Sequence, residues 1–279
     1  MKRGFYLLTL LLATALFSCT SDQSKSNKEK SGSGTDVNGG IKELKKSEYS
    51  TEPNDLIKLN INGSIKTINE SDFIVGFKQG VVQKLKLQSK RVITFDEQGY
   101  LILQSNIDAK GEVKETASYK YDGLGRKTEY QCNVTEGNFS YTSKFSYDDK
   151  GRMIEEVARY SDGSLYYKAT FGYDEKGNQT EYTLYNLMGN VLKHITFKYD
   201  DANRVIEEST LKPDGTLITR YIYKYDNHGN KIEHAAYNPD NSLKGALTFE
   251  YVYDAAGNWI KKTTLKNGKP IEITERIIN

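Results

Sequence analysis

An aromatic residue followed by aspartate recurs along this chain at a nearly constant interval, and this repeat constrains the fold more than any other feature. The pair stands at Phe95-Asp96, Tyr121-Asp122, Tyr147-Asp148, Tyr173-Asp174, Tyr199-Asp200, Tyr225-Asp226 and Tyr253-Asp254. The interval is 26 residues five times in succession and 28 residues at the last step. A constant period of this length indicates an architecture built from repeated structural units.

Each unit contains two turns. Three residues after the aspartate comes Gly99, Gly125, Gly151, Gly177, Asn203, Gly229 or Gly257, and a second turn is marked by Gly111, Gly137, Gly163, Gly189, Gly215, Asn241 or Gly268. Aspartate suits the first position of a type I turn, and glycine or asparagine suits the left-handed position that ends it. A calcium site is the alternative role for the aspartates, but one carboxylate per turn is too few for that ion. The spacing leaves room only for short strands, so the sequence predicts an all-β antiparallel meander of two-strand units, coiled or folded on itself.

The faces of these strands are predicted from alternation. Two aromatic residues stand two positions apart before the turns: Tyr119/Tyr121, Phe145/Tyr147, Phe171/Tyr173, Phe197/Tyr199, Tyr223/Tyr225 and Tyr251/Tyr253. Residues two apart share a face of a strand, which we expect to be buried. On the same face we expect Thr128, Ile154, Thr180, Ile206, Ile232 and Ile260, followed by Cys132, Ala158, Leu184 and Ala236. The opposite face then carries Lys120, Lys198 and Lys224 beside a column of glutamates at Glu129, Glu155, Glu181, Glu207 and Glu233.

A second, longer period underlies the first. After the turn glycine the successive units read KTEY, MIEE, QTEY, VIEE, KIEH and WIKK, so that similar letters return every second unit. Neighbouring hairpins with different surroundings would produce this pattern, and so would descent from a duplicated pair of hairpins.

The N-terminus has the parts of a secretory signal. Lys2 and Arg3 precede an apolar run from Phe5 to Phe17, which is too short to span a bilayer. The sequence Leu16-Phe17-Ser18-Cys19 resembles the lipobox of bacterial lipoproteins. We therefore predict a signal peptide over residues 1–18 and lipidation of Cys19. Ser21 rather than aspartate follows the cysteine by two, and the resemblance to other lipoproteins implies that this favours the outer membrane over the inner. The alternative is an ordinary signal peptide with a chance cysteine.

The rest of the chain divides into a tether and a folded part. Residues 19–53 are rich in serine, lysine, glycine and asparagine and are predicted to be a flexible polar tether. The β domain is expected over residues 54–279, with an irregular N-terminal cap of about four strands over 54–91 and the repeats over 92–279. In the cap, Ile57, Leu59 and Ile61 alternate up to a hairpin turn at Asn62-Gly63, and residues 73–77 pair with residues 81–87 through a turn at Gln79-Gly80.

The repeated motif identifies a resemblance. Tyr-Asp-x-x-Gly-Arg and Tyr-Asp-x-x-Gly-Asn, with an aromatic residue two positions before the tyrosine, resemble the YD repeats of Rhs and teneurin proteins from about Val92 to Lys266. A lipobox, a polar tether and about seven such repeats are similar to the small YD-repeat lipoproteins of Bacteroidetes. The resemblance implies a coiling β-meander, which in large members encloses a hollow shell. Seven units are too few for a large shell, and about ten residues follow the last repeat, so the resemblance brings no toxin domain.

Composition and motifs bound the function. A net charge of +2 argues against a nucleic-acid-binding protein, and the two cysteines form no disulfide framework. We find no phosphate-binding loop, metal-ligand spacing or nucleophile elbow, so we expect no cofactor, no metal and no enzyme activity. The predicted function is a lipid-anchored envelope protein that presents a β-scaffold to a glycan, peptide or envelope protein. One alternative is an immunity or accessory component of an Rhs-type toxin system, and another is a glycoside hydrolase using two members of the glutamate column.

One position is a candidate binding site. Trp259 is the only tryptophan, and alternation places it on the charged face near Lys261, where it would offer a stacking surface for a sugar or an aromatic side chain. The alternative is that Trp259 covers the open edge of the sheet by packing on residues 271–277.

Overall fold

The computed structural model describes residues 54–279. The predicted signal peptide, Cys19 and the tether lie outside the described residues. Within residues 54–279, no helix has the length and apolar character needed to cross a membrane.

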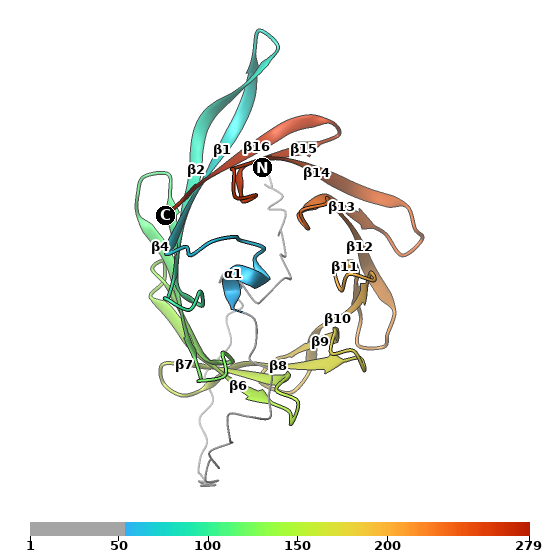
Figure 1. The fold of residues 1–279 in the computed structure, drawn as a ribbon. Coiled ribbons are helices and arrows are strands. Elements are labelled where there is room, and N and C mark those ends of the chain that lie inside the picture. The colour runs from blue at the N-terminus through green and yellow to red at the C-terminus, as the bar shows by residue number, and fades with distance from the viewer. Residues whose placement is uncertain (1–53) are drawn as a thin grey trace.

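The described residues form a closed barrel of sixteen antiparallel strands, shown in Figure 1. The strands are β1 (Thr67–Lys78), β2 (Val81–Phe95), β3 (Leu101–Asp108), β4 (Val113–Tyr121), β5 (Lys127–Val134), β6 (Phe139–Tyr147), β7 (Met153–Tyr160), β8 (Leu165–Tyr173), β9 (Gln179–Tyr185), β10 (Val191–Tyr199), β11 (Val205–Leu211), β12 (Leu217–Tyr225), β13 (Lys231–Tyr237), β14 (Leu243–Tyr253), β15 (Trp259–Lys266) and β16 (Lys269–Ile278). Each strand pairs with its neighbour in sequence, and β1 pairs with β16 to close the ring. The all-β meander is confirmed, and the form that it takes is a barrel. Every strand therefore has two hydrogen-bonded neighbours within residues 67–278.

The repeated aspartate builds its turn as the sequence predicts. Asp122 Oδ1 accepts hydrogen bonds from the backbone N–H groups of Leu124 (2.9 Å) and Arg126 (3.0 Å). Asp122 Oδ2 accepts from Arg126 Nε at 2.8 Å. Gly125 ends the turn at φ +78°, a left-handed conformation that glycine adopts without steric cost. The carboxylate thus satisfies backbone donors at the turn.

A β-bulge follows the aspartate turn and changes which residues face inward. Lys120 lies opposite Glu129, but Tyr121 lies opposite Lys127, so Thr128 has no partner in the ladder. The equivalent shift occurs after the turns that follow β6, β8, β10, β12 and β14. The prediction that the Thr128 and Ile154 positions share the buried face is therefore wrong, and Ile154 is 40% exposed. The residues that line the interior are instead Lys127, Met153, Gln179, Val205, Lys231 and Trp259.

The bulge also explains the repeated tyrosine. A bulge leaves a backbone group outside the ladder, and a tyrosine hydroxyl from the next hairpin donates to the carbonyl of the residue that precedes the bulged one. These bonds run from Tyr147 to Lys127 O (2.6 Å), Tyr173 to Met153 O (2.7 Å), Tyr199 to Gln179 O (2.7 Å), Tyr225 to Val205 O (2.6 Å) and Tyr251 to Lys231 O (2.8 Å). Each bond spans 20 residues and joins two consecutive hairpins. At the two-residue insertion in the last interval, Tyr251 takes over this role from Tyr253.

The inward face of the aromatic pairs is confirmed. Tyr119, Tyr130 and Tyr182 are buried, and Phe171 packs against Tyr182 in the second of two apolar clusters. Cys132 and Ala158 are fully buried in the first cluster, as alternation predicts.

The predicted N-terminal cap is partly wrong. Residues 55–58 form a helix, α1 (Asp55–Lys58), in place of the expected strand and of the hairpin at Asn62-Gly63. Asn54 caps this helix by accepting a hydrogen bond from Ile57 N at 3.0 Å, and three alternating apolar residues are too short a pattern to distinguish the two structures. The turn at Gln79-Gly80 is confirmed, but the strands that it joins, β1 and β2, belong to the barrel wall.

Candidate functional site: the barrel lumen

The outer wall of the barrel is charged and ion-paired. Lys120 Nζ lies 2.7 Å from Glu129, Lys198 Nζ lies 2.9 Å from Glu207, and Lys224 Nζ lies 2.9 Å from Glu233. Lys144 also pairs with Glu129. The predicted lysine and glutamate columns are thus confirmed as the outward face. A barrel wall that contacts lipid carries an apolar band there instead.

The inner wall encloses a cavity of about 1040 Å³. Aromatic rings from the repeats line it, among them Phe145, Tyr147, Phe171, Tyr173, Phe197, Tyr199, Tyr223, Tyr225, Phe249 and Tyr251. Charged side chains lie between these rings, so the lumen combines flat apolar surfaces with polar groups. Ligand cavities commonly have this composition.

A charged cluster lies in the lumen where the barrel closes. Glu70 of β1 accepts from Arg91 Nη1 of β2 at 2.9 Å and from Arg276 Nε of β16 at 2.8 Å. Burial alone would raise the pKa of the Glu70 carboxyl, but the two guanidinium groups outweigh it and hold that pKa below its usual range. Beside them, Asp72 Oδ1 accepts from Thr274 Oγ1 at 2.7 Å. This cluster joins the first two strands to the last.

Trp259 lies at the same cluster and not on the charged outer face, so its predicted face is wrong, while a binding role for Trp259 and Lys261 stays a prediction. The Arg276 guanidinium stands 3.3 Å from the centroid of the tryptophan ring, and the Tyr251 ring lies 5.9 Å away. Lys261 belongs to the outer wall, with Glu275 opposite it on β16. In the alternative, the packing of Trp259 on residues 271–277 is confirmed by its contact with Arg276, but there is no open edge to cover because β16 pairs with β1. The bulge at Ile260, which alternation does not reveal, reverses the face of Trp259.

The 52-residue period describes the lumen wall. The fourth letter of each post-turn motif faces inward opposite the first aromatic of the preceding strand, as Glu156 does opposite Phe145 and Glu208 opposite Phe197. Tyrosine or histidine occupies this position in alternate hairpins, at Tyr130, Tyr182 and His234. Carboxylates and rings therefore alternate around the lumen, which fits the interpretation that neighbouring hairpins have different surroundings.

The lumenal carboxylates are held by tyrosine hydroxyls. Tyr167 donates to Glu156 Oε1 at 2.6 Å, and Tyr223 donates to Glu208 Oε2 at 3.0 Å. Burial raises the pKa of both carboxyls. The same burial lowers the pKa of neighbouring bases, which favours their neutral forms. It lowers the pKa of Lys231 to about 8, and with the adjacent Lys231 charge it lowers the pKa of His234 to about 4.

One mouth of the barrel is crossed by residues 54–66, which we name the strap. At its start, Asp55 Oδ2 accepts from Tyr121 Oη (2.7 Å) and from Leu101 N (2.9 Å). At its far side, Asn62 N donates to Asn258 Oδ1 at 2.7 Å, and Asn258 Nδ2 donates back to Asn62 O at 3.0 Å. Between them Asn60 donates to the carbonyl of His228. The strap thus spans the mouth that carries the aspartate turns, and Figure 1 shows α1 inside the outline of the barrel.

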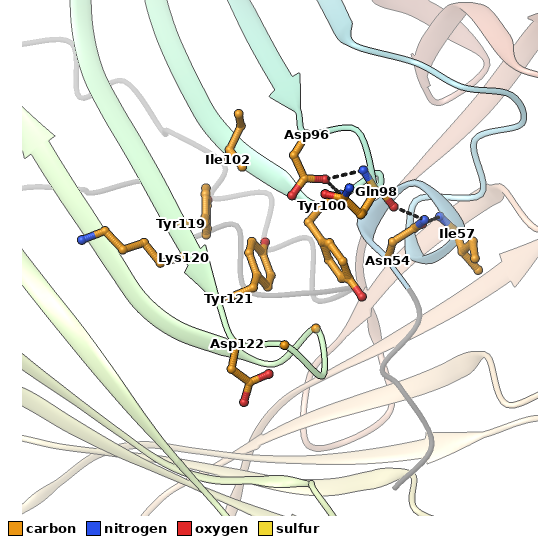
Figure 2. A pocket seen from close by; sticks show the side chains of 12 residues that line it. Asn54, Ile57, Asp96, Gln98, Tyr100, Ile102, Tyr119, Lys120, Tyr121 and Asp122 are labelled. Carbon is orange, nitrogen blue, oxygen red and sulfur yellow. Dashed lines mark hydrogen bonds between the residues drawn. The ribbon is translucent and has the colours of Figure 1, made fainter. Parts of the chain in front are cut away.

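Figure 2 shows the shallow hollow of about 1020 Å³ where the strap meets the first two aspartate turns. Asn54 Nδ2 donates to Gln98 O at 2.6 Å, and Asp96 Oδ1 accepts from Tyr100 N at 2.8 Å. Tyr100 packs so closely on the next turn that a Cβ at Gly125 would lie 2.1 Å from its hydroxyl. The polar groups of this hollow hold the strap in place, so we regard the lumen as the candidate ligand site.

Two buried polar atoms near the lumen have no hydrogen-bond partner among the described residues. They are the Tyr119 hydroxyl and Gln104 Oε1, from adjacent strands β4 and β3. Buried polar groups are nearly always satisfied by protein, water or ligand, so these atoms are available to bond to a bound molecule. Residues 54–279 contain no group of three or more histidine, cysteine, aspartate or glutamate side chains arranged to hold a metal ion.

The lumenal polar groups were not predicted from the sequence. Trp259 was singled out, but it was assigned to the outer wall. The glutamate column considered for a glycosidase lies on the outer wall. The 52-residue period was the signal in the sequence that could have indicated the lumen. The first and fourth letters of each post-turn motif vary with this period, and these two positions face the lumen in each hairpin. Glu70, Arg91 and Arg276 lie outside the repeated motif and had no such signal.

No family model and no curated protein matches this chain. Among solved structures, a porin-like protein from Bacteroides uniformis is similar over 78% of this chain and 98% of its own, at 13% identity and a TM-score of 0.52. A porin-like protein from Bacteroides vulgatus is similar over 77% of this chain and 98% of its own, at 15% identity and a TM-score of 0.43. A TcdB2-TccC3-Cdc42 complex is similar over 75% of this chain and 11% of that one, at 15% identity and a TM-score of 0.31. The first of these similarities shows the barrel fold.

Proposed function

We propose that this protein is a lipid-anchored barrel of the bacterial envelope that binds a glycan in its lumen without catalysing a reaction. The observation that carries the proposal is the polarity of the two walls. Ion-paired lysines and glutamates lie on the outside, with exposed apolar residues such as Ile154 and Val252 between them, whereas aromatic rings and buried hydrogen-bonding groups face the cavity. This distribution favours a barrel whose outer wall faces water and whose lumen holds a ligand, rather than a barrel whose outer wall contacts lipid.

A sugar fits the chemistry of the lumen. The apolar faces of a pyranose ring pack on aromatic rings such as Phe171 and Phe197. Its hydroxyls both donate and accept, so they can satisfy the Tyr119 hydroxyl, which lines the cavity. Because the strap crosses the mouth of the aspartate turns, the ligand would pass through the opposite mouth.

A pair of adjacent substitutions tests the lumenal site. Met153 lines the lumen, whereas the neighbouring Ile154 is the bulged residue and is exposed. In a glycan-array screen of residues 54–279, followed by calorimetry with the best ligand, Met153→Trp should fill the cavity and lower affinity at least about tenfold, which corresponds to about 1.4 kcal/mol. Ile154→Trp should bind as the parent does. Equal affinity of both variants, or no glycan bound by the parent, would contradict the proposal.

The envelope location rests on Cys19 and is tested separately. The lipobox motivates the proposal, and the fold similarity to Bacteroides porin-like proteins supports an envelope setting. Cys19→Ala should move the full-length protein from the membrane to the soluble fraction of cells. The variant remaining in the membrane fraction would argue against the anchor. Membership of an Rhs-type toxin system stays an untested alternative.

A further inference from the structure

The hairpin of β1 and β2 extends beyond the barrel wall. The pairing of β1 with β16 ends at Ile74, and the pairing of β2 with β3 begins at Ser89. Residues 75–88, which we name the ribbon, therefore pair with no strand other than β1 and β2, and Figure 1 shows this hairpin projecting from the wall. The turn of the ribbon lies at the end of β1 away from the strap. A two-stranded ribbon alone is marginally stable in water, so this projection calls for an explanation.

Large apolar side chains are exposed on the ribbon. Phe77 is 57% exposed, Val81 62% and Leu85 66%. Leu85 lies over Gly76, where an added Cβ would stand 2.6 Å from its Cδ1. Val75 and Phe77 lie on one face of the ribbon. Gly76 and Lys78 lie on the other face, where Leu85 covers Gly76, so both faces carry apolar residues. An exposed group of this kind marks an interaction surface.

The charge of this segment has one sign. Residues 73–91 contain Lys78, Lys84, Lys86, Lys90 and Arg91 and no aspartate or glutamate. Lys84 pairs with Glu275, and Arg91 pairs with Glu70 in the lumen. Lys78, Lys86 and Lys90 form no ion pair with any residue in the described part of the chain. On the outer wall, by contrast, most lysines have a glutamate partner.

We propose that the ribbon docks on the surface of an anionic lipid bilayer. Apolar side chains at the tip enter the boundary between headgroups and acyl chains, and the surrounding lysines extend to the phosphates. Lipid is favoured over an acidic protein because apolar residues occupy both faces of the ribbon. A bilayer surrounds an inserted tip, whereas a protein partner adding a strand would pair with one edge. This contact is independent of the lumenal site and of acylation at Cys19.

Vesicle co-sedimentation tests the proposal with residues 54–279, which lack Cys19. The protein should sediment with vesicles of equal phosphatidylglycerol and phosphatidylcholine and remain in solution with phosphatidylcholine alone. The triple variant Lys78→Gln, Lys86→Gln, Lys90→Gln should weaken binding at least about tenfold, because each basic residue near an anionic surface adds to the attraction. Phe77→Ser with Leu85→Ser should weaken it similarly. Raising the salt concentration should weaken binding of the parent by screening the charges.

A matched control uses three exposed lysines of the outer wall. Lys144→Gln, Lys198→Gln and Lys224→Gln remove the same charge away from the ribbon, and this triple variant should bind vesicles as the parent does. The melting temperatures of the ribbon variants should match the parent because the ribbon lies outside the closed wall. The vesicles contain lipid and no protein, so failure of the parent to sediment with them would overturn the proposal. Equal losses in the ribbon and control triples would also overturn it.

Discussion

Two parts of the barrel are joined by different interactions. In the repeat wall, β4 to β13, neighbouring hairpins are joined by neutral tyrosine-to-carbonyl bonds that span 20 residues each, as from Tyr173 to Met153. At the seam, where β16, β1 and β2 meet, a buried carboxylate lies between two guanidinium groups, and Glu70 and Arg276 are 206 residues apart in sequence. The repeat wall uses many local and interchangeable contacts. The seam uses one cluster whose members depend on each other.

This difference bears on energy and on the order of assembly. A neutral hydrogen bond contributes about 1 kcal/mol, so losing one leaves the others intact. Removing one member of a buried ion cluster leaves an unpaired charge, which costs about 3–5 kcal/mol. Contacts distant in sequence also require a larger loss of chain entropy before they form. We therefore expect the repeat wall to form first and the seam to close the barrel afterwards.

The largest expected effect is at the seam. Glu70→Ala leaves Arg276 buried without its partner, and it should lower the free energy of unfolding by about 3–5 kcal/mol in urea titrations. Glu181→Gln, an exposed change on the outer wall, is the control and should stay within about 0.5 kcal/mol of the parent. A loss at Glu70 no greater than that of one tyrosine hydroxyl would remove the distinction between the two parts.

A core position in the repeat wall should come next. Phe171 packs against Tyr182 with ring centroids 5.6 Å apart. Phe171→Ala removes this packing and should cost about 3 kcal/mol, the lower end of the range for buried aromatic truncations because the ring is partly exposed to the lumen. A melting temperature equal to that of Glu181→Gln would show that the inward and outward faces contribute alike.

A lumenal lysine gives the repeat wall a pH dependence. Burial lowers the pKa of Lys231 to about 8 from an ordinary value of 10.5. Between these values the unfolded chain binds more protons than the folded one, so this group adds stability as pH rises and opposes folding most below pH 8. Lys231→Met should therefore be more stable than the parent at pH 7 by about 2–3 kcal/mol. Urea unfolding at pH 7 and pH 9.5 should show that advantage narrowing, and a constant advantage would be inconsistent with the shifted pKa.

The smallest expected effect concerns one tyrosine bond. Tyr173→Phe removes the hydroxyl that donates to Met153 O and should cost about 1 kcal/mol. Tyr225→Phe, two hairpins further along, removes the equivalent bond to Val205 O, and the double variant should lose the sum of the two. Strong non-additivity in denaturant unfolding would show that the hairpins do not act as independent units.

The parts that the sequence predicted are those governed by local chemistry. The Asp122 carboxylate and Gly125 specify their turn whatever surrounds it, and alternation placed Tyr119 inward and Lys120 outward correctly. Alternation failed after the turn, because the bulge adds one residue and reverses the predicted faces of Lys127 and Thr128. Barrel closure was also missed. The pairing of β1 with β16 joins residues about 200 positions apart, such as Ile68 and Ile278, and neither strand contains the repeated motif.

The candidate site was missed for the same reason. Alternation assigned Trp259 to the outside, and the bulge places it inside against Arg276. The strap was missed because its short apolar alternation fits a strand as well as a helical turn. Asn62, which looked like half of a hairpin turn, instead uses its backbone N–H to hold Asn258 across the mouth.

The antiparallel contact between β1 and β16 has a consequence for how such a chain can change in length. An antiparallel ring closes only with an even number of strands, and each 26-residue unit contributes two. Duplication or loss of a whole unit therefore preserves the closing contact, while loss of half a unit would bring β16 to β1 in the wrong direction. Since barrel diameter grows with strand number, tandem duplication would widen the channel in discrete steps without rebuilding its closure. The 26-residue repeat that is duplicated or lost is then also the step by which the diameter of the barrel changes.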